Sequence, residues 1–236
     1  MTTDPQRRRR LVIFGGGLLL VITAVAIAIA VSSGGSSSST TFTTTATAPA
    51  KSEFAGIPQT GNVLGDPNAK ATLMVFADMQ CPFCGEFERG AFPSIVKRYV
   101  KTGKLKVIFQ PISILGTDSV VGSKAVAAAA AQKKFFDYAA AFYANQGQEN
   151  TGYVTSDFLT KLAKSVPGLD VAKWQQALNS GSGATILTAA QTAAQTARVS
   201  STPTFMVAKN GQTLEQFQPN DLTAQAFYAK LDSLTG

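Results

Sequence analysis

The amino-acid sequence predicts an α/β protein with one folded domain, preceded by one N-terminal transmembrane helix. Three observations support this fold class. Residues 11–31 carry no charged side chain, and residues 71–109 contain an apolar strand, a helix and a second strand in succession. A largely helical stretch of about 118–197 then precedes two more strands. The helical stretch is therefore expected to be an insertion into an α/β core.

Composition excludes several classes of site. The 236 residues include two cysteines and no histidine, so a Ser-His-Asp hydrolase and a Cys-His protease are impossible. Two cysteines cannot supply the four ligands of a usual structural zinc site, and we expect no bound metal. Cys84 is followed by Gly85 instead of histidine, which excludes covalent c-type haem attachment.

The N-terminal segment predicts attachment to a membrane. A helix over residues 11–31 would be about 31 Å long, close to the thickness of a bilayer's hydrocarbon core. Residues 1–10 include four consecutive arginines, which predicts a cytoplasmic tail and places everything after residue 31 outside the cytoplasm. A cleaved signal peptide ending near Ala28-Ile29-Ala30 and a twin-arginine signal at Arg9-Arg10 are the alternatives, and both also predict export.

The net charge of +7 does not indicate nucleic-acid binding. The four arginines of the tail supply much of this charge, and no basic cluster occurs after residue 10. Residues 32–55 are rich in serine and threonine and are expected to form a flexible linker. The folded domain is expected to span residues 56–236.

The first part of that domain is predicted to be a βαβ unit. Residues 71–77 (ATLMVFA) form an apolar run typical of a strand buried on both faces. Pro82 suits the first position of a helix, which we expect to continue to about Val100. Residues 105–109 (LKVIF) are expected to form a second, parallel strand.

The rest of the domain is predicted to be helices followed by a hairpin. Phe135, Tyr138 and Phe142 form a stripe expected to lie in the core. The helices that follow are expected to be capped by Ser156 or Asp157 and by Asp170, and the last of them to end near Arg198. Strands 204–208 and 213–217 are expected around a tight turn at Asn210-Gly211, and a helix over 221–234 completes the domain.

Cys81-Pro82-Phe83-Cys84 lies where the apolar strand meets the helix. Unpaired N–H groups and the helix dipole stabilise an anion at a helix N-terminus, so the Cys81 pKa should be lowered and its thiolate reactive. Cys84 lies one turn later, where its sulfur can reach Cys81. A structural disulfide, a metal site shared between two chains and two buried thiols are the alternatives.

A second signal is Thr202-Pro203, directly before a predicted strand. Proline lacks the N–H donor that a central strand needs, which implies a special geometry. A cis bond would place the Thr202 backbone beside the sulfurs, where it could pair with an extended substrate. An ordinary trans proline at the start of a strand is the alternative.

These motifs together closely resemble the exported DsbA-like thiol-disulfide oxidoreductases of Gram-positive bacteria, which have a thioredoxin fold with a helical insertion. The resemblance covers about residues 63–234 and is carried by residues 78–84 (DMQCPFC), Asn145-Gln146 and residues 201–205 (STPTF). It implies that Cys81 is the exposed nucleophile and Cys84 its buried partner. No cofactor is needed beyond the redox-active Cys81–Cys84 disulfide, and Pro203 would be the cis proline. Pro82, Phe83, Thr202 and Pro203 are expected to bind substrate.

The sequence departs from the pattern of these enzymes at two positions. Many strongly oxidising relatives carry histidine inside the dithiol motif, where this chain has Phe83, so a milder oxidant is expected. Relatives often have a buried acid six residues before the first cysteine, where this chain has Val75. Glu86 or water is then the candidate proton acceptor for Cys84.

The sequence therefore predicts an anchored, extracytoplasmic enzyme that introduces disulfides into exported proteins. Its substrates would be reduced exported proteins, and the resemblance implies a membrane redox partner of the DsbB or vitamin K epoxide reductase type. A reductase or isomerase of the same fold is one alternative. A tethered, non-catalytic binding or chaperone module is the other.

Overall fold

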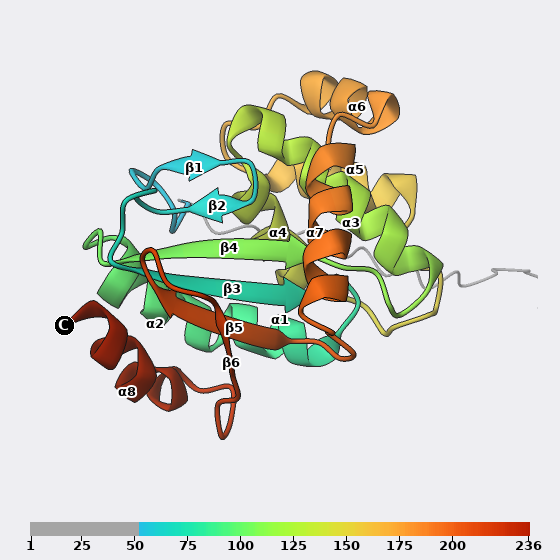
Figure 1. The fold of residues 1–236 in the computed structure, drawn as a ribbon. Coiled ribbons are helices and arrows are strands. Elements are labelled where there is room, and N and C mark those ends of the chain that lie inside the picture. Colours follow the sequence, from blue (N-terminus) through green and yellow to red (C-terminus); the bar gives the residue numbers. More distant parts are fainter. Residues whose placement is uncertain (1–51) are drawn as a thin grey trace, which may run out of the picture. The chain divides into compact units, whose positions relative to one another are not determined.

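The computed structural model describes residues 52–236 (Figure 1). Within these residues six strands form one sheet in the order β1-β2-β4-β3-β5-β6. The strands are β1 (Gln59–Thr60), β2 (Val63–Leu64), β3 (Ala71–Ala77), β4 (Leu105–Pro111), β5 (Thr204–Lys209) and β6 (Glu215–Phe217). The predicted cytoplasmic tail and transmembrane helix lie outside the described residues. Among the helices of residues 52–236, none is both long and apolar enough to cross a bilayer.

Strand β3 is the centre of the sheet, as its continuous apolar run predicts. It pairs in parallel with β4, with Ala71 opposite Leu105, and antiparallel with β5, with Val75 opposite Phe205. Every residue of β3 is buried. The strand ends at Ala77, so both of its neighbours hold the segment that leads directly to Cys81.

Helices cover both faces of this sheet. On one face, Met74 and Phe76 of β3 pack against Ala190 and Ala194 of α7 (Ala184–Thr196), which crosses the sheet in Figure 1. On the other face, the larger core includes Val75 and side chains of three further helices. Those helices are α1 (Pro82–Arg89), α2 (Ala91–Ile95) and α8 (Ala224–Thr235).

The prediction of one continuous helix from Pro82 to about Val100 is wrong. Helix α1 ends at Arg89, α2 follows Gly90, and a π-helical turn spans Val96–Val100. Pro93 has no N–H to donate to the Arg89 carbonyl, so the regular hydrogen-bond ladder is interrupted there. The predicted start at Pro82 is confirmed.

The helical insertion lies between β4 and β5. It comprises α3 (Thr117–Ala129), a 3₁₀ turn at Ala130–Gln132, α4 (Phe135–Ala144), α5 (Ser156–Ser165), α6 (Val171–Ser180) and α7. Asp170 caps α6 as predicted, whereas the cap of α5 is Thr155 instead of Ser156 or Asp157. The predicted aromatic stripe is fully buried, and Tyr138 stacks on Trp174.

The C-terminal hairpin forms with a longer connection than predicted. Strand β5 pairs with β6 from Phe205 opposite Phe217 to Val207 opposite Glu215, so Asn210-Gly211 is part of a wide loop. The N–H of Asn210 donates instead to the Lys70 carbonyl over 2.7 Å, which explains why the chain does not turn back at once.

Two features at the start of the domain were missed. The short β1–β2 hairpin adds to the β4 edge, with Val63 opposite Ile108. Phe54 was expected within the linker that ends at residue 55, but it is buried and contacts Phe92 and Phe136. The folded domain therefore begins before residue 56.

Phe87 attaches α1 to the core, and its replacement tests that attachment. Its ring lies 4.8 Å from the Phe205 ring and 5.4 Å from the Phe227 ring, between centroids. We expect Phe87→Ala to lower the free energy of unfolding by about 3–5 kcal/mol, as is usual for a buried phenylalanine. Urea unfolding followed by circular dichroism measures this. Phe83→Ala on the same helix is the control, because Phe83 is 60% exposed and its loss should change stability by less than about 0.5 kcal/mol.

Candidate active site

The two cysteines occupy the first turn of α1. Cys81 is the N-cap residue with an extended backbone, Pro82 is the first helical residue, and no side chain caps this terminus. The Cys81 carbonyl accepts the first helical hydrogen bond, from the Gly85 N–H over 3.1 Å. Cys81 and Cys84 are free thiols 3.4 Å apart, close enough to form a disulfide after a small rotation.

The proline loop before β5 faces the first cysteine. The Thr202-Pro203 bond is cis, as expected. The Cys81 sulfur lies 3.2 Å from the Thr202 carbonyl oxygen, to which it donates when it is protonated, although 121 positions separate the two residues. Two motifs distant in the sequence therefore meet at one sulfur.

The structure corrects one expectation about this pair. Cys81 was expected to be exposed, but only 4% of its surface is accessible, compared with 2% for Cys84. The Thr202 segment lies directly against the sulfur and covers it. The neighbours remain open, because Pro82 and Phe83 are exposed and Pro203 is half-buried.

The environment makes the two thiols very different acids. A hydrogen bond from Cys84 is the largest influence on Cys81, and with the Thr202 side chain and the backbone N–H groups of Cys84 and Phe83 it lowers the Cys81 pKa to about 6 despite burial. Burial raises the pKa of Cys84 well above its usual value, and the neighbouring Cys81 raises it further. At neutral pH the site holds a Cys81 thiolate beside a protonated Cys84.

A buried carboxylate holds the turn that leads to Cys81. The Asp78 side chain accepts hydrogen bonds from the backbone N–H groups of Gln80, Ile114 and Leu115 and from the Ser119 hydroxyl, over 2.5–3.0 Å. These donors come from three segments, so Asp78 joins the end of β3 to the start of the helical insertion. Sequence reasoning quoted Asp78 within a motif but gave it no role. Its signal was a charged residue directly after a fully apolar strand.

Two residues of the helical insertion hold the same turn from the other side. The Gln146 amide donates to the carbonyls of Met79 and Cys81 over 2.9 and 3.0 Å. The Tyr143 hydroxyl donates to the Asp78 carbonyl over 3.1 Å. Helix α4 and the loop after it therefore fix the backbone that carries the nucleophile.

The structure also shows which of the positions near the dithiol carry a buried acid. Val75 is buried in β3 and carries no titratable group, and Glu86 lies on the exposed face of α1. Glu88, one turn after Cys84, is the acidic residue of α1 that is buried. Sequence reasoning did not consider it.

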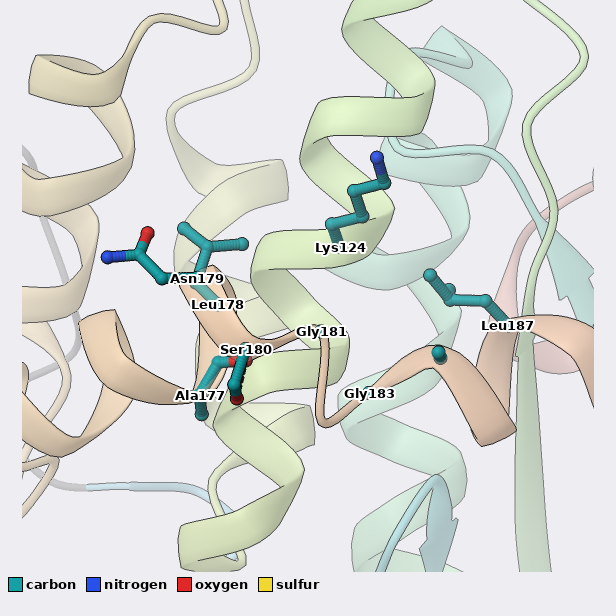
Figure 2. Close-up of a pocket in the computed structure, with 9 residues that line it drawn as sticks. Lys124, Ala177, Leu178, Asn179, Ser180, Gly181, Gly183 and Leu187 are labelled. Atoms are coloured by element: carbon teal, nitrogen blue, oxygen red, sulfur yellow. Dashed lines mark hydrogen bonds between the residues drawn. The ribbon is translucent and has the colours of Figure 1, made fainter.

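The remaining candidate features, a cavity and possible metal-binding clusters, do not contribute to the dithiol site. A cavity of about 270 Å³ lies between α3, α6 and α7. Lys124, Leu178 and Leu187 are among the residues that line it (Figure 2). Neither cysteine, nor Thr202 or Pro203, lines it, so it is separate from the dithiol. Within residues 52–236, no group of three acidic or cysteine side chains is placed to hold a metal ion.

A thioredoxin-type sheet, a dithiol at a helix N-terminus and a cis proline against the first sulfur define the class of thiol-disulfide exchange proteins. The family model described as Thioredoxin matches residues 58–225. The chain therefore belongs to the thioredoxin family, and the predicted thioredoxin fold with a helical insertion is confirmed.

The chain is similar to several known relatives. The "Disulfide bond formation protein D" of Bacillus subtilis strain 168 is 26% identical over 165 residues, which are 67% of this chain and 72% of that protein. The crystal structure of oxidised BdbD from Bacillus subtilis has a TM-score of 0.65 at 22% identity and covers 76% of this chain and 98% of that one. The α-DsbA1 structure from Wolbachia pipientis has a TM-score of 0.64 at 20% identity and covers 79% and 96%. The fold is thus of the DsbA and BdbD type.

The lowered Cys81 pKa can be measured directly. In the reduced protein, alkylation by iodoacetamide should show one reactive thiolate with a pKa of about 6, and peptide mapping should place the label at Cys81. Cys84→Ala removes the strongest hydrogen bond to the thiolate and should raise that pKa. A reactive thiol that titrates near 9 in the unaltered protein would contradict the assignment.

The same shift predicts how the stability of the reduced protein depends on pH. Because the folded-state pKa of Cys81 is below its unfolded value of 9, this thiolate stabilises the folded state above pH 9, and its contribution is lost as the pH falls through about 6. Urea midpoints measured between pH 6 and 9 should therefore rise with pH. Cys81→Ala should flatten this part of the profile.

Proposed function

We propose that this protein is an extracytoplasmic thiol-disulfide oxidoreductase that introduces disulfides into exported proteins. The single observation that carries the proposal is the pairing of a thiolate at Cys81 with a protonated thiol at Cys84. Stabilising the Cys81 thiolate stabilises the dithiol form, which makes the disulfide form an electron acceptor. The named relatives, among them a disulfide bond formation protein, support the same activity.

In the proposed cycle, a substrate thiolate attacks the Cys81 sulfur of the Cys81–Cys84 disulfide. The bond between the two cysteines breaks and Cys84 leaves. A second substrate thiolate then attacks the substrate sulfur of the mixed disulfide, and Cys81 leaves as a thiolate. The substrate loses two electrons and the enzyme becomes the dithiol. The low pKa of Cys81 makes it the better leaving group in this second step.

The surroundings of the sulfur are suited to an extended polypeptide. Phe83 presents a large apolar side chain to solvent beside the dithiol. We assign Pro82, Phe83, Thr202 and Pro203 as the substrate-binding residues. Substrate must replace the Thr202 carbonyl contact to reach the buried Cys81 sulfur, so binding and access to the nucleophile are linked.

The proposed location rests on the N-terminal sequence, and the proposed redox partner rests on the resemblance to DsbA-like enzymes. The apolar run at 11–31, preceded by four arginines, favours a single-pass anchor with the N-terminus in the cytoplasm and the catalytic domain outside. Reduced exported proteins would be the substrates. A membrane protein of the DsbB or vitamin K epoxide reductase type would reoxidise the dithiol.

Replacing the proposed nucleophile tests whether the dithiol performs the activity. The full-length oxidised protein should accelerate the oxidative refolding of a reduced, disulfide-containing substrate, and Cys81→Ser should abolish this acceleration. Cys84→Ser is the matched variant, because it keeps Cys81. When its Cys81 is first converted to a mixed disulfide with glutathione, a substrate thiolate should displace glutathione and the Cys81–substrate mixed disulfide should accumulate. Equal catalysis by Cys81→Ser and the unaltered protein would instead support a non-catalytic binding or chaperone module.

The redox potential tests the direction of the reaction. Equilibration with glutathione should give a value between those of thioredoxin, about −270 mV, and DsbA, about −120 mV. The lowered Cys81 pKa raises the potential above that of thioredoxin, while Phe83 provides no cationic side chain to raise it as far as DsbA. A potential as low as that of thioredoxin would assign the protein as a reductase.

A further inference from the structure

Glu88 is a buried carboxyl group that the exchange chemistry described above does not use. The residue is only 4% exposed. Within the described part of the chain, neither carboxyl oxygen has a hydrogen-bond partner. Burying a carboxylate without a partner is strongly unfavourable, so a structure that keeps one must hold it protonated or use it transiently.

The position of Glu88 relates it to the dithiol. It follows Cys84 by four residues on α1, so the two side chains lie on the same face of the helix, with Cβ atoms about 6 Å apart. Side chains of a helix lean towards its N-terminus and cover the preceding turn. The preceding turn is here the one that contains Cys84, which is buried with Glu88 on this face.

Tyr143 provides independent evidence that these groups share one environment. Its hydroxyl is buried on α4. Burial is the largest cause that raises its pKa, and Cys84, Glu88, Asp78 and Cys81 raise it further by electrostatic repulsion. The hydroxyl donates to the Asp78 carbonyl directly before the dithiol turn. Glu88 and Cys84 therefore both lie within electrostatic range of one tyrosine hydroxyl, in the interface of α1 and α4.

The charges near Glu88 favour its neutral form. Burial, followed by repulsion from Glu53, raises the Glu88 pKa well above its usual value. Partial burial raises the pKa of Glu53 as well; Lys101 opposes this shift and Asp137 adds to it. The adjacent cation, Arg89, is turned to the Tyr143 carbonyl, to which it donates over 2.5 Å.

We propose that Glu88 is the proton donor and acceptor for Cys84, in place of the acid that position 75 lacks. When a thiolate attacks Cys81 and breaks the disulfide, Cys84 leaves as a thiolate. The Glu88 carboxyl gives its proton to that sulfur, and solvent later restores the proton to the carboxylate. In reoxidation, the Cys81 thiolate first attacks a disulfide of the oxidant and forms a mixed disulfide with it. The Glu88 carboxyl releases its proton to solvent and then accepts the proton of the Cys84 thiol. The Cys84 sulfur attacks the Cys81 sulfur, the mixed disulfide breaks, and the thiolate of the oxidant leaves. This inference rests on the proposed function.

Glu88 replaces both candidates that the sequence suggested. Glu86 is exposed and lies two residues from Cys84, which places its side chain on a different face of the helix. The Cys84 thiol is 2% exposed and has little contact with bulk water. A protonated carboxyl that is already held one turn away can transfer a proton during the exchange step, and its own slower exchange with solvent can follow.

The test measures how the rate constant for reduction of the Cys81–Cys84 disulfide by glutathione depends on pH. The full-length protein is used, and the reaction is followed by rapid acid quenching and mass spectrometry. Each rate constant is divided by the thiolate fraction of glutathione. In the unaltered protein, the corrected constant should be high while Glu88 is protonated and fall at least about tenfold as pH rises through its pKa, because general acids contribute about 10²–10⁴ to rates. In Glu88→Gln it should stay low and independent of pH.

Glu86→Gln is the matched control and should keep the unaltered profile. Urea midpoints should show Glu88→Gln to be at least as stable as the unaltered protein, since an amide costs less to bury than a carboxylate. An unchanged profile in Glu88→Gln, or a corrected profile of the unaltered protein that is flat with pH, would overturn the proposal. Failure of the unaltered protein to react with glutathione at all would overturn the proposed function instead.

A measurement that needs no variant is also available. The infrared difference spectrum between the dithiol and disulfide forms of the unaltered protein should show a change in the carbonyl band of a protonated buried carboxyl. If that band is identical in the two forms, Glu88 does not respond to the state of Cys84, and the proposal is wrong even if Glu88→Gln fails to fold.

Discussion

The chemistry of this protein depends on the interaction between one sulfur and the first turn of one helix. Cys81 caps α1 with no competing side chain, and Pro82 removes one of the backbone donors that a helix start leaves unpaired. The N–H groups of Phe83 and Cys84 and the Cys84 thiol then stabilise negative charge on the Cys81 sulfur. Without this arrangement the pair would be two ordinary buried thiols.

The rest of the fold holds that turn in place. Strand β3 is buried on both faces and paired on both edges, so its end is fixed where the dithiol turn begins. Asp78 ties the turn to the loop before α3, and Gln146 ties it to the loop after α4. The helical insertion is therefore part of the site, because it orients the backbone on which the sulfur is mounted.

Local sequence signals were sufficient to predict several elements of the structure. The apolar run of β3, the proline at the start of α1, the Asp170 cap and the Thr202-Pro203 motif each gave the correct element. The break at Gly90 was also predictable from the local sequence, because Gly90 and Pro93 are helix-breaking residues that the single-helix prediction overlooked. The wide hairpin loop and the burial of Cys81 were not predictable in this way. They depend on the bond from Asn210 to Lys70 and on the approach of Thr202 across 121 positions.

The role of Glu88 was likewise not predictable from local sequence signals. An acid at this position also explains why the site does not need one at position 75, where the chain has valine. A strand buried between two helical layers favours valine, which costs no desolvation there. A carboxyl is easier to keep on α1, where it can be neutral until Cys84 requires its proton. Sequence spacing alone shows only that Glu88 follows Cys84 by one turn. Its burial and its lack of a hydrogen-bond partner are properties of the packed structure, and they turn an ordinary helical glutamate into a group suited to proton transfer.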